Sequence, residues 1–218
     1  IPTNGSLRDK RGKPSDKRNR EILSRRKRMI ETVISPRNMQ QACIQVVQNK
    51  GSAGVDGMPV TALKDFVRQN KKEIGEAMKK GEYRAQPILG VPIPKSNGKT
   101  RLLGIPTVID RWLQQCVAQA IMPQFEVEFK SHSEGIRPGK NAHQCVQQAQ
   151  QYINEGFSHI VDIDLKSFFD EVDHCILMQL VYRKVKCATT LRLIRKWLRA
   201  PIMIDGKLVR RRIPNLVD

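Results

Sequence analysis

The sequence is poor in the features that mark several common protein classes. Aromatic residues make up only 5% of its 218 residues, so stacking of bases on an aromatic platform is not an obvious binding mode. The five cysteines include no Cys-x-x-Cys pair and the four histidines have no zinc-ligand spacing beside them. This argues against structural zinc and favours a reducing, intracellular setting such as the cytoplasm. The apolar runs are far too short to span a bilayer, so no membrane partner is expected.

Acidic residues are also scarce relative to basic ones. There are 39 Lys and Arg against 21 Asp and Glu, which gives a formal net charge of +18 and points to a polyanionic partner, most plausibly nucleic acid. Residues 1–37 are especially basic, and we expect an extension that runs into a short helix over about 20–33. Its run Arg25, Arg26, Lys27 and Arg28 is a candidate RNA-binding arm, and a solvated charged face is the alternative.

The most informative segment is HIVDIDLKSFFDEVDH, residues 159–174. Its apolar alternation predicts a strand with Asp162 and Asp164 on one face. Two carboxylates that close repel each other unless a cation lies between them or water screens them. In so basic a chain the segment predicts a site for Mg²⁺ and a phosphate substrate, and the alternative is a pair of solvated acids at a strand end.

Elsewhere the patterns predict helices and hairpins in mixed order. Apolar spacing and caps predict helices over 38–49, from about 61, over 110–129, and over 141–153, the last capped by Asn141. Two more are expected over 173–185, capped by Asp173, and to residue 198, capped by Thr189 or Thr190. Hairpins are expected over 88–105, around an SNGK turn, and over 202–209, around Asp205-Gly206. Prolines favour an edge position for the strand over 88–94. The fold class is therefore α+β.

A phosphoryl-transfer site needs cationic groups on the phosphates as well as carboxylates that hold a metal. Lys95 and Arg101 flank the flexible SNGK turn and could close on a triphosphate. Lysine and arginine flank many turns without any function, so the hairpin alone leaves an ordinary solvated surface as the alternative.

Taken in order, four stretches resemble the reverse transcriptases of group II introns, the intron-encoded maturases. They are GVDG at 54–57, IPKSNGKTRLLGIPTVIDRWLQQ at 93–115, SEGIRPGKNAH at 133–143 and VDIDLKSFFD at 161–170. The resemblance covers about residues 38–209. It implies an RNA-directed DNA polymerase that uses an RNA template, a DNA primer, deoxynucleoside triphosphates and two Mg²⁺ ions, and that binds its own group II intron RNA to assist splicing.

The resemblance also implies roles for single residues. Asp164 is then the catalytic carboxylate and holds Mg²⁺ together with the Leu165 carbonyl, whereas Asp162 is a neighbour. The amides of Ser167 and Phe168 face the triphosphate, and Phe169 crowds the 2′ position of the sugar.

In the hairpin, Lys95 and Arg101 match the triphosphate contacts of the family. Arg137 lies in a block near the template path and is either a strand contact or half of a structural ion pair.

The family has the right-hand fold of polymerases, with fingers and palm. By the resemblance, the chain divides into a basic extension (1–37), fingers (38–106), the first part of the palm (107–172) and a return to the fingers with a non-family tail (173–218). The chain contains neither a Pro-Gln-Gly block nor Tyr-Ala-Asp-Asp, so we expect a truncated fragment that is inactive alone. The unpaired sheet edge of such a palm favours a homodimer. The rival hypotheses are an RNA-binding splicing factor without polymerase activity and, less consistent with the acidic segment, a generic basic RNA-binding protein.

Overall fold

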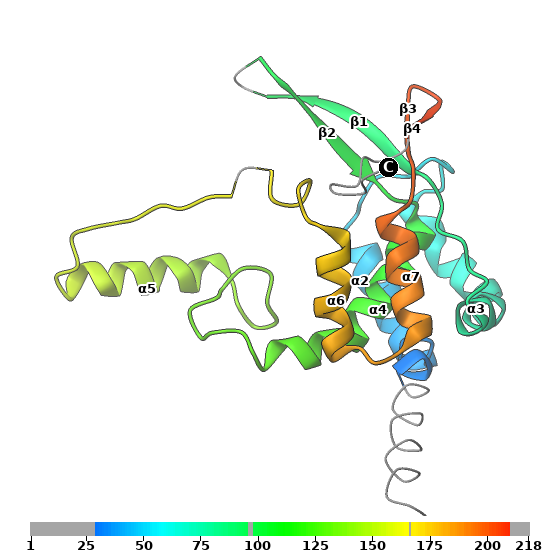
Figure 1. The fold of residues 1–218 in the computed structure, drawn as a ribbon, viewed down its shortest axis with the longest axis horizontal. Helices are drawn as coiled ribbons and strands as arrows, with labels where there is room; N and C mark the ends of the chain where they lie inside the picture. The colour runs from blue at the N-terminus through cyan, green and yellow to red at the C-terminus, as the bar shows by residue number, and fades with distance from the viewer. Residues whose placement is uncertain (1–28, 96–97, 166, 210–218) are drawn as a thin grey trace, which may run out of the picture.

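The computed structural model describes residues 29–95, 98–165 and 167–209. Figure 1 shows a body of packed helices with strands at one end, and an arm containing α5 that extends away from it. The helices are α2 (Pro36–Gln48), α3 (Leu63–Lys80), α4 (Val108–Glu126), α5 (Ala142–Asn154), α6 (His174–Lys184) and α7 (Ala188–Leu198), with a 3-10 turn, η1, at Val60–Ala62. The strands are β1 (Ile88–Pro94), β2 (Thr100–Ile105), β3 (Ile202–Ile204) and β4 (Lys207–Val209). The fold thus mixes helices and strands, as the sequence predicts.

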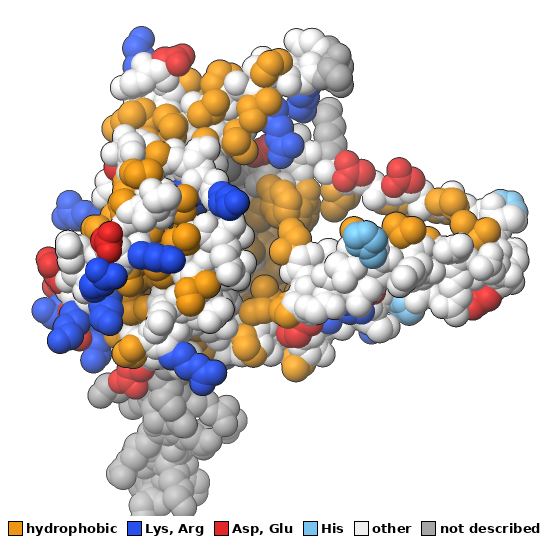
Figure 2. All heavy atoms as spheres, turned by 180° about the vertical axis from the view of Figure 1, so that it is seen from behind, with side chains coloured by type: hydrophobic (Ala, Val, Ile, Leu, Met, Phe, Trp, Pro, Cys, Tyr) orange, Lys and Arg blue, Asp and Glu red, His pale blue; other side chains and the backbone are white. Residues whose placement is uncertain are grey.

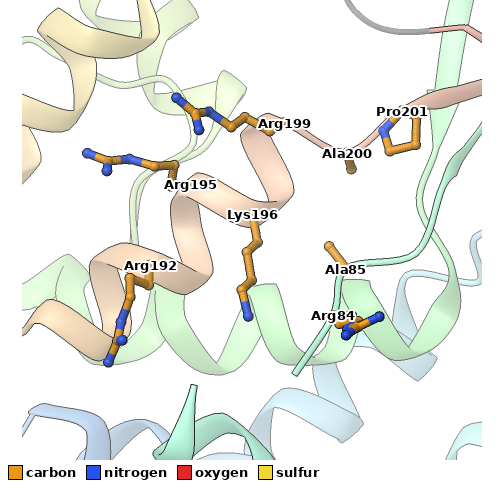
Figure 3. A pocket seen from close by; sticks show the side chains of 8 residues that line it. All are labelled: Arg84, Ala85, Arg192, Arg195, Lys196, Arg199, Ala200 and Pro201. Carbon is orange, nitrogen blue, oxygen red and sulfur yellow. The ribbon is translucent and has the colours of Figure 1, made fainter. Parts of the chain in front are cut away.

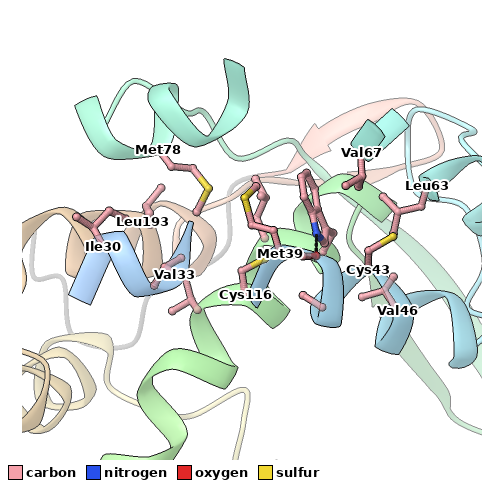
Figure 4. Packing of buried hydrophobic residues seen from close by; sticks show 14 of the residues in the cluster. Ile30, Val33, Met39, Cys43, Val46, Leu63, Val67, Met78, Cys116 and Leu193 are labelled. Carbon is pink, nitrogen blue, oxygen red and sulfur yellow. Dashed lines mark hydrogen bonds between the residues drawn. The ribbon is translucent and has the colours of Figure 1, made fainter. Parts of the chain in front are cut away.

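The hydrophobic core lies between α2 and α4, with α3 and α7 packed beside them (Figure 4). The apolar face predicted for residues 110–129 is confirmed, because Trp112, Leu113, Cys116 and Val117 of α4 are all buried. The Trp112 indole Nε1 donates a hydrogen bond of 2.9 Å to the carbonyl of Met39 on α2, so its one polar atom is satisfied in the core. Residues on both sides of position 107, where the boundary between fingers and palm is expected, contribute to this one core.

Local capping explains where several helices begin. Asn141 and Gln144 form a reciprocal capping box at the start of α5, and the Asp173 side chain accepts hydrogen bonds from the first amides of α6, as predicted. The caps proposed at Thr189 and Thr190 are wrong, because α7 begins after Cys187 and Thr190 lies fully buried within it. Thr190 is one helical turn before the buried Leu193, so both residues lie on the face of α7 that packs against the core.

Both predicted hairpins are present in one sheet with the strand order β2-β1-β3-β4. β1 pairs antiparallel with β2, and β3 with β4, whereas β1 and β3 are parallel. The edge position predicted for the first strand is wrong at its start, because Ile88 and Leu89 pair with β3. The prolines lie beyond that short pairing, where a missing N–H costs no ladder hydrogen bond.

The GVDG turn approaches the start of α4 closely. A Cβ at Gly54 would lie 2.7 Å from the Thr107 Cα, which no side chain could occupy, so glycine is required there. Arg111, one turn into α4, donates a hydrogen bond to the carbonyl of Ser52 in the same loop. This loop is thus fixed against the residues that lead from the hairpin into α4.

The arm consists of the loop over 127–141, α5, and an extended segment that returns to α6 (Figure 1). α5 contributes no buried residue. The strand predicted around Asp162 and Asp164 is absent: residues 157–165 form no ladder, and Val161 and Ile163 are each 81% exposed. A strand is stable only when a neighbour satisfies its backbone groups, and the described residues offer this segment none. Hydrophobic side chains line the hollow between the body and the arm (Figure 2).

Candidate active site and nucleic-acid contacts

Backbone pairing fixes the hairpin that carries Lys95 and Arg101. Arg101 lies opposite Ile93 in the β1–β2 register, and the Lys95 amide donates a hydrogen bond of 2.7 Å to the Lys99 carbonyl. The amide of Gly98, a residue with φ 75°, donates a hydrogen bond of 3.1 Å to the Lys95 carbonyl. Both cationic side chains are exposed, and neither forms an ion pair with a carboxylate in the described part of the chain. They are therefore available to an external anion.

The base of this hairpin is held by a buried carboxylate that the sequence reasoning did not single out. Asp110 is 1% exposed and accepts four hydrogen bonds from other residues. Its Oδ1 accepts from the Tyr83 hydroxyl at 2.8 Å and the Trp197 indole at 2.7 Å. Its Oδ2 accepts from the Gln86 amide at 2.9 Å and the Thr107 hydroxyl at 3.0 Å. The network joins the start of α4, the segment before β1, and α7.

Burial and the Asp110 charge act together on Tyr83. Desolvation, followed by repulsion from Asp110 and the hydrogen bond to it, raises the pKa of Tyr83 well above its ordinary value. The phenol is therefore a permanent donor at physiological pH. The sequence does carry one local signal for this network, because Thr107 caps α4 and Asp110 follows three residues later in its first turn, the spacing of a capping box.

The segment with the predicted catalytic residue is exposed. Asp164 lies in the extended part, and a turn follows in which Ser167 has φ 52°. The Phe168 amide donates to the Leu165 carbonyl at 3.4 Å, so the two backbone groups predicted for triphosphate and metal contact each other here. The rings of Phe168 and Phe169 meet edge to face, 5.3 Å between centroids, and Phe169 is 83% exposed.

Within the described ranges, no three His, Cys, Asp or Glu side chains are grouped so that they could hold a metal ion. Asp162 and Asp164 offer the hard oxygen donors that Mg²⁺ prefers, but they do not complete a site with a third group. The described residues therefore do not by themselves fit a two-metal centre.

Arg137 is used mainly within the chain. Its guanidinium forms an ion pair with Glu126 at 2.7 Å, donates to the carbonyls of Lys130 and Ser133, and lies over the Phe129 ring. Its side chain is only 11% exposed. This geometry corresponds to the structural alternative and fixes the loop after α4. The basic run Arg25, Arg26, Lys27 and Arg28 lies outside the described residues.

Comparison with known proteins places this chain in a family. The model of the family described as reverse transcriptase (RNA-dependent DNA polymerase) matches residues 93–217, which include the β1–β2 turn, Asp110 and Asp164. The chain therefore belongs to the reverse transcriptase family.

Its relatives include proteins of group II introns, which confirms the resemblance noted in the sequence. The chain is 30% identical to the group II intron-encoded protein LtrA of Lactococcus lactis subsp. cremoris over 79% of this chain and 29% of LtrA. It is 31% identical to protein YkfC of Escherichia coli over 79% of this chain and 47% of YkfC. It is 28% identical to nuclear intron maturase 1, mitochondrial, of Arabidopsis thaliana over 61% of this chain and 17% of that protein. The chain thus spans less than half the length of these relatives. None of the helices that the structure describes could cross a membrane.

Proposed function

We propose that this chain forms the fingers and the first part of the palm of an RNA-directed DNA polymerase of a group II intron, and that its partner is intron RNA. One observation carries the proposal: a single family match spans both the β1–β2 hairpin and the segment with Asp164. The two cations of that hairpin are exposed and form no ion pair with a described carboxylate. The parent protein would copy an RNA template from a DNA primer with deoxynucleoside triphosphates.

In this proposal Lys95 and Arg101 bind the triphosphate, because both cations flank the hairpin turn and neither is neutralised by a described carboxylate. In the parent protein Asp164 and the Leu165 carbonyl would hold Mg²⁺ together with groups outside the described residues, and the ion would supply charge neutralisation at the phosphates. The amides of Ser167 and Phe168 face the triphosphate, and the exposed Phe169 ring closes the space beside the sugar. The hydrogen bond from the Phe168 amide to the Leu165 carbonyl is long and therefore weak. Breaking it, so that these groups can contact the triphosphate and Mg²⁺, would cost little free energy.

The packing supports a return of the chain to the fingers after residue 173. β3 hydrogen bonds to the start of β1, and the Ile88 amide donates to the Pro201 carbonyl at 2.8 Å. Lys196 and Trp197 of α7 contact the segment before β1 and Asp110, respectively. The base of the hairpin therefore contacts elements that precede the Asp164 segment in the sequence and elements that follow it.

The decisive experiment is primer extension on an RNA template by the full-length parent protein. Asp164→Asn removes the proposed metal ligand and should abolish extension, whereas Asp162→Asn, two residues away in the same exposed segment, should retain most of it. Both variants should bind intron RNA as the parent does, because neither residue is a phosphate contact. Extension by Asp164→Asn would contradict the assignment. A parent without polymerase activity that still promotes splicing would favour the splicing-factor hypothesis.

The 218-residue chain alone should not extend a primer at any Mg²⁺ concentration, since its described residues group no set of metal ligands. Extension by the chain that its own Asp164→Asn variant loses would show that it holds a complete site.

A further inference from the structure

A second basic feature lies away from the hairpin turn and the Asp164 segment. A cleft of about 430 Å³ opens between α7 and the segment that precedes β1, and five of its lining residues are cationic: Arg84, Arg192, Arg195, Lys196 and Arg199. Figure 3 shows the side chains of Arg192, Arg195 and Arg199 projecting from successive turns of α7. Among the described residues that line the cleft, none is acidic or aromatic.

The sequence of α7 explains why three arginines share one surface. Leu193 is fully buried and Trp197 reaches Asp110, so these residues fix the inner face of the helix. Arg192, Arg195 and Arg199 are exposed and follow one another at spacings of three and four, which places them along one outer stripe. Packing of the inner face therefore holds the stripe in a fixed orientation.

Lys196 has a different task from the arginines. Its ammonium donates hydrogen bonds of 2.7 Å to the carbonyls of Gly81 and Tyr83, just after α3 ends. It satisfies backbone acceptors at the negative end of that helix and ties α7 to the chain that leads to Arg84. The cleft walls are thus joined by a specific contact, and Arg84 lines the cleft on the side of the segment that precedes β1.

The described part of the chain offers the arginines of the cleft no acidic partner. No carboxylate among the described residues forms an ion pair with Arg84, Arg192, Arg195 or Arg199. Like charges gathered on one rigid surface repel one another, and a bound anion would relieve that repulsion. The planar guanidinium fork matches phosphate oxygens in two-point contacts, so phosphate is the anion that this set suits best.

We propose that this cleft binds the phosphodiester backbone of RNA, as a docking contact separate from the nucleotide site. The proposal rests on the proposed function for the identity of the ligand. Several arginines along one helix suit successive phosphates of a strand better than a single small anion. No described residue that lines the cleft is aromatic, and phosphate contacts carry no base information, so the contact should be largely independent of base sequence.

The test compares two variants of the 218-residue chain with the same change in net charge. Arg192→Gln, Arg195→Gln and Arg199→Gln together remove the stripe, and Lys64→Gln, Lys71→Gln and Lys72→Gln remove three exposed cations from α3. Binding to an end-labelled RNA hairpin is measured against salt concentration. The stripe variant should lose about tenfold or more in affinity, and its log–log salt slope should fall by about two to three. The α3 variant should lose clearly less.

Equal losses in the two variants would overturn the proposal, because the effect would then reflect net charge alone. A second variant covers a failure of the first to fold. Arg192→Lys, Arg195→Lys and Arg199→Lys together keep the charge but remove the forks, so the salt slope should persist while affinity falls by a few fold. Unchanged affinity in this charge-retaining variant would overturn the proposed two-point phosphate contacts.

Two further arms separate this proposal from others. Vesicles that contain anionic lipid should not compete with the RNA hairpin; binding to vesicles that depends on the stripe, with unchanged RNA binding, would assign the cleft to a membrane surface. Asp164→Asn in this chain should bind the RNA hairpin normally. A parent that fails to polymerise would leave this RNA-binding result intact, so the two proposals can fail independently.

Discussion

The indole Nε1 of Trp197 on α7 donates a hydrogen bond of 2.7 Å to the carboxylate of Asp110 on α4. The two residues are 87 positions apart in the sequence, and the segment with Asp164 lies between them. Because the Asp110 carboxylate also binds the Gln86 amide just before β1, one buried group positions α7 and the base of the hairpin together. The position of the hairpin that carries Lys95 and Arg101 thus depends on Asp110, which lies outside that hairpin.

Asp110→Asn should destabilise the chain by about 3 kcal/mol, because charge-assisted hydrogen bonds weaken and the new amide group faces donors that it cannot satisfy. Thermal or urea unfolding measures the change. Asp65→Asn is the matched control: Asp65 is exposed in the first turn of α3 and pairs with Arg68 at 3.2 Å, so its loss should change stability by less than about 1 kcal/mol. Equal effects of the two substitutions would show that Asp110 is not the hub described.

Tyr83 should make the chain sensitive to high pH. Its pKa is raised in the folded state, so above its ordinary value of 10.0 the unfolded chain loses the phenolic proton while the folded chain retains it. The free energy of unfolding should therefore be unaffected by this group below pH 10 and should fall as the pH rises further. Tyr83→Phe should be less stable near neutrality and should lack that part of the alkaline decline. An identical alkaline decline in both proteins would contradict the coupling to Asp110.

Local signals were sufficient for the hairpins and for most helix starts. The Asp205-Gly206 turn has both residues at positive φ, 48° and 75°, which is the tight-turn conformation that this dipeptide favours. Helix caps at Asn141 and Asp173 likewise depend on groups within three residues. Such features can be predicted because cause and effect lie within a few positions of each other.

Long-range features could not be predicted in the same way. The partners of Asp110 include residues 27 and 87 positions away, and the basic cleft is lined both by Arg84 and by residues of α7, so neither feature follows from a local pattern. The strand expected around Asp164 failed for a related reason. Apolar alternation shows that a segment can be a strand, but a ladder needs a neighbour, and the described residues pair nothing with it.

In the parent polymerase, Lys95→Ala and Arg101→Ala should each lower kcat/KM for deoxynucleotides by about tenfold to a hundredfold, the usual cost of losing a hydrogen bond to a charged group. Steady-state primer extension at varied triphosphate concentration measures this. Lys79→Ala, which removes an exposed cation from the last turn of α3, should leave kcat/KM unchanged. A loss of RNA affinity of the same size in the hairpin variants would instead indicate a template contact.

The basic run outside the described residues should govern the salt dependence of RNA binding. Replacing Arg25, Arg26, Lys27 and Arg28 by Ala in the 218-residue chain should weaken binding and flatten the log–log salt slope, because fewer counterions are released from phosphates. The thermal unfolding midpoint should remain close to that of the parent chain, since replacing charged residues outside a core changes stability little. Unchanged affinity and slope would show that the run is a solvated face only.

Phe169 and Phe168 allow the proposed sugar gate to be tested with a neighbour as control. The two rings are in edge-to-face contact, so truncation of either removes the same aromatic pair. Phe169→Ala in the parent polymerase should open space at the 2′ position and raise ribonucleotide incorporation relative to deoxynucleotide by about tenfold or more, because exclusion by size is lost. Phe168→Ala should leave that ratio nearly unchanged, since this residue is proposed to contribute its amide rather than its ring. Competition between the two nucleotide types in primer extension gives the ratio directly. Equal shifts in both variants would indicate that the ring pair orders the turn as a whole, and unchanged selectivity in Phe169→Ala would place the gate at another residue.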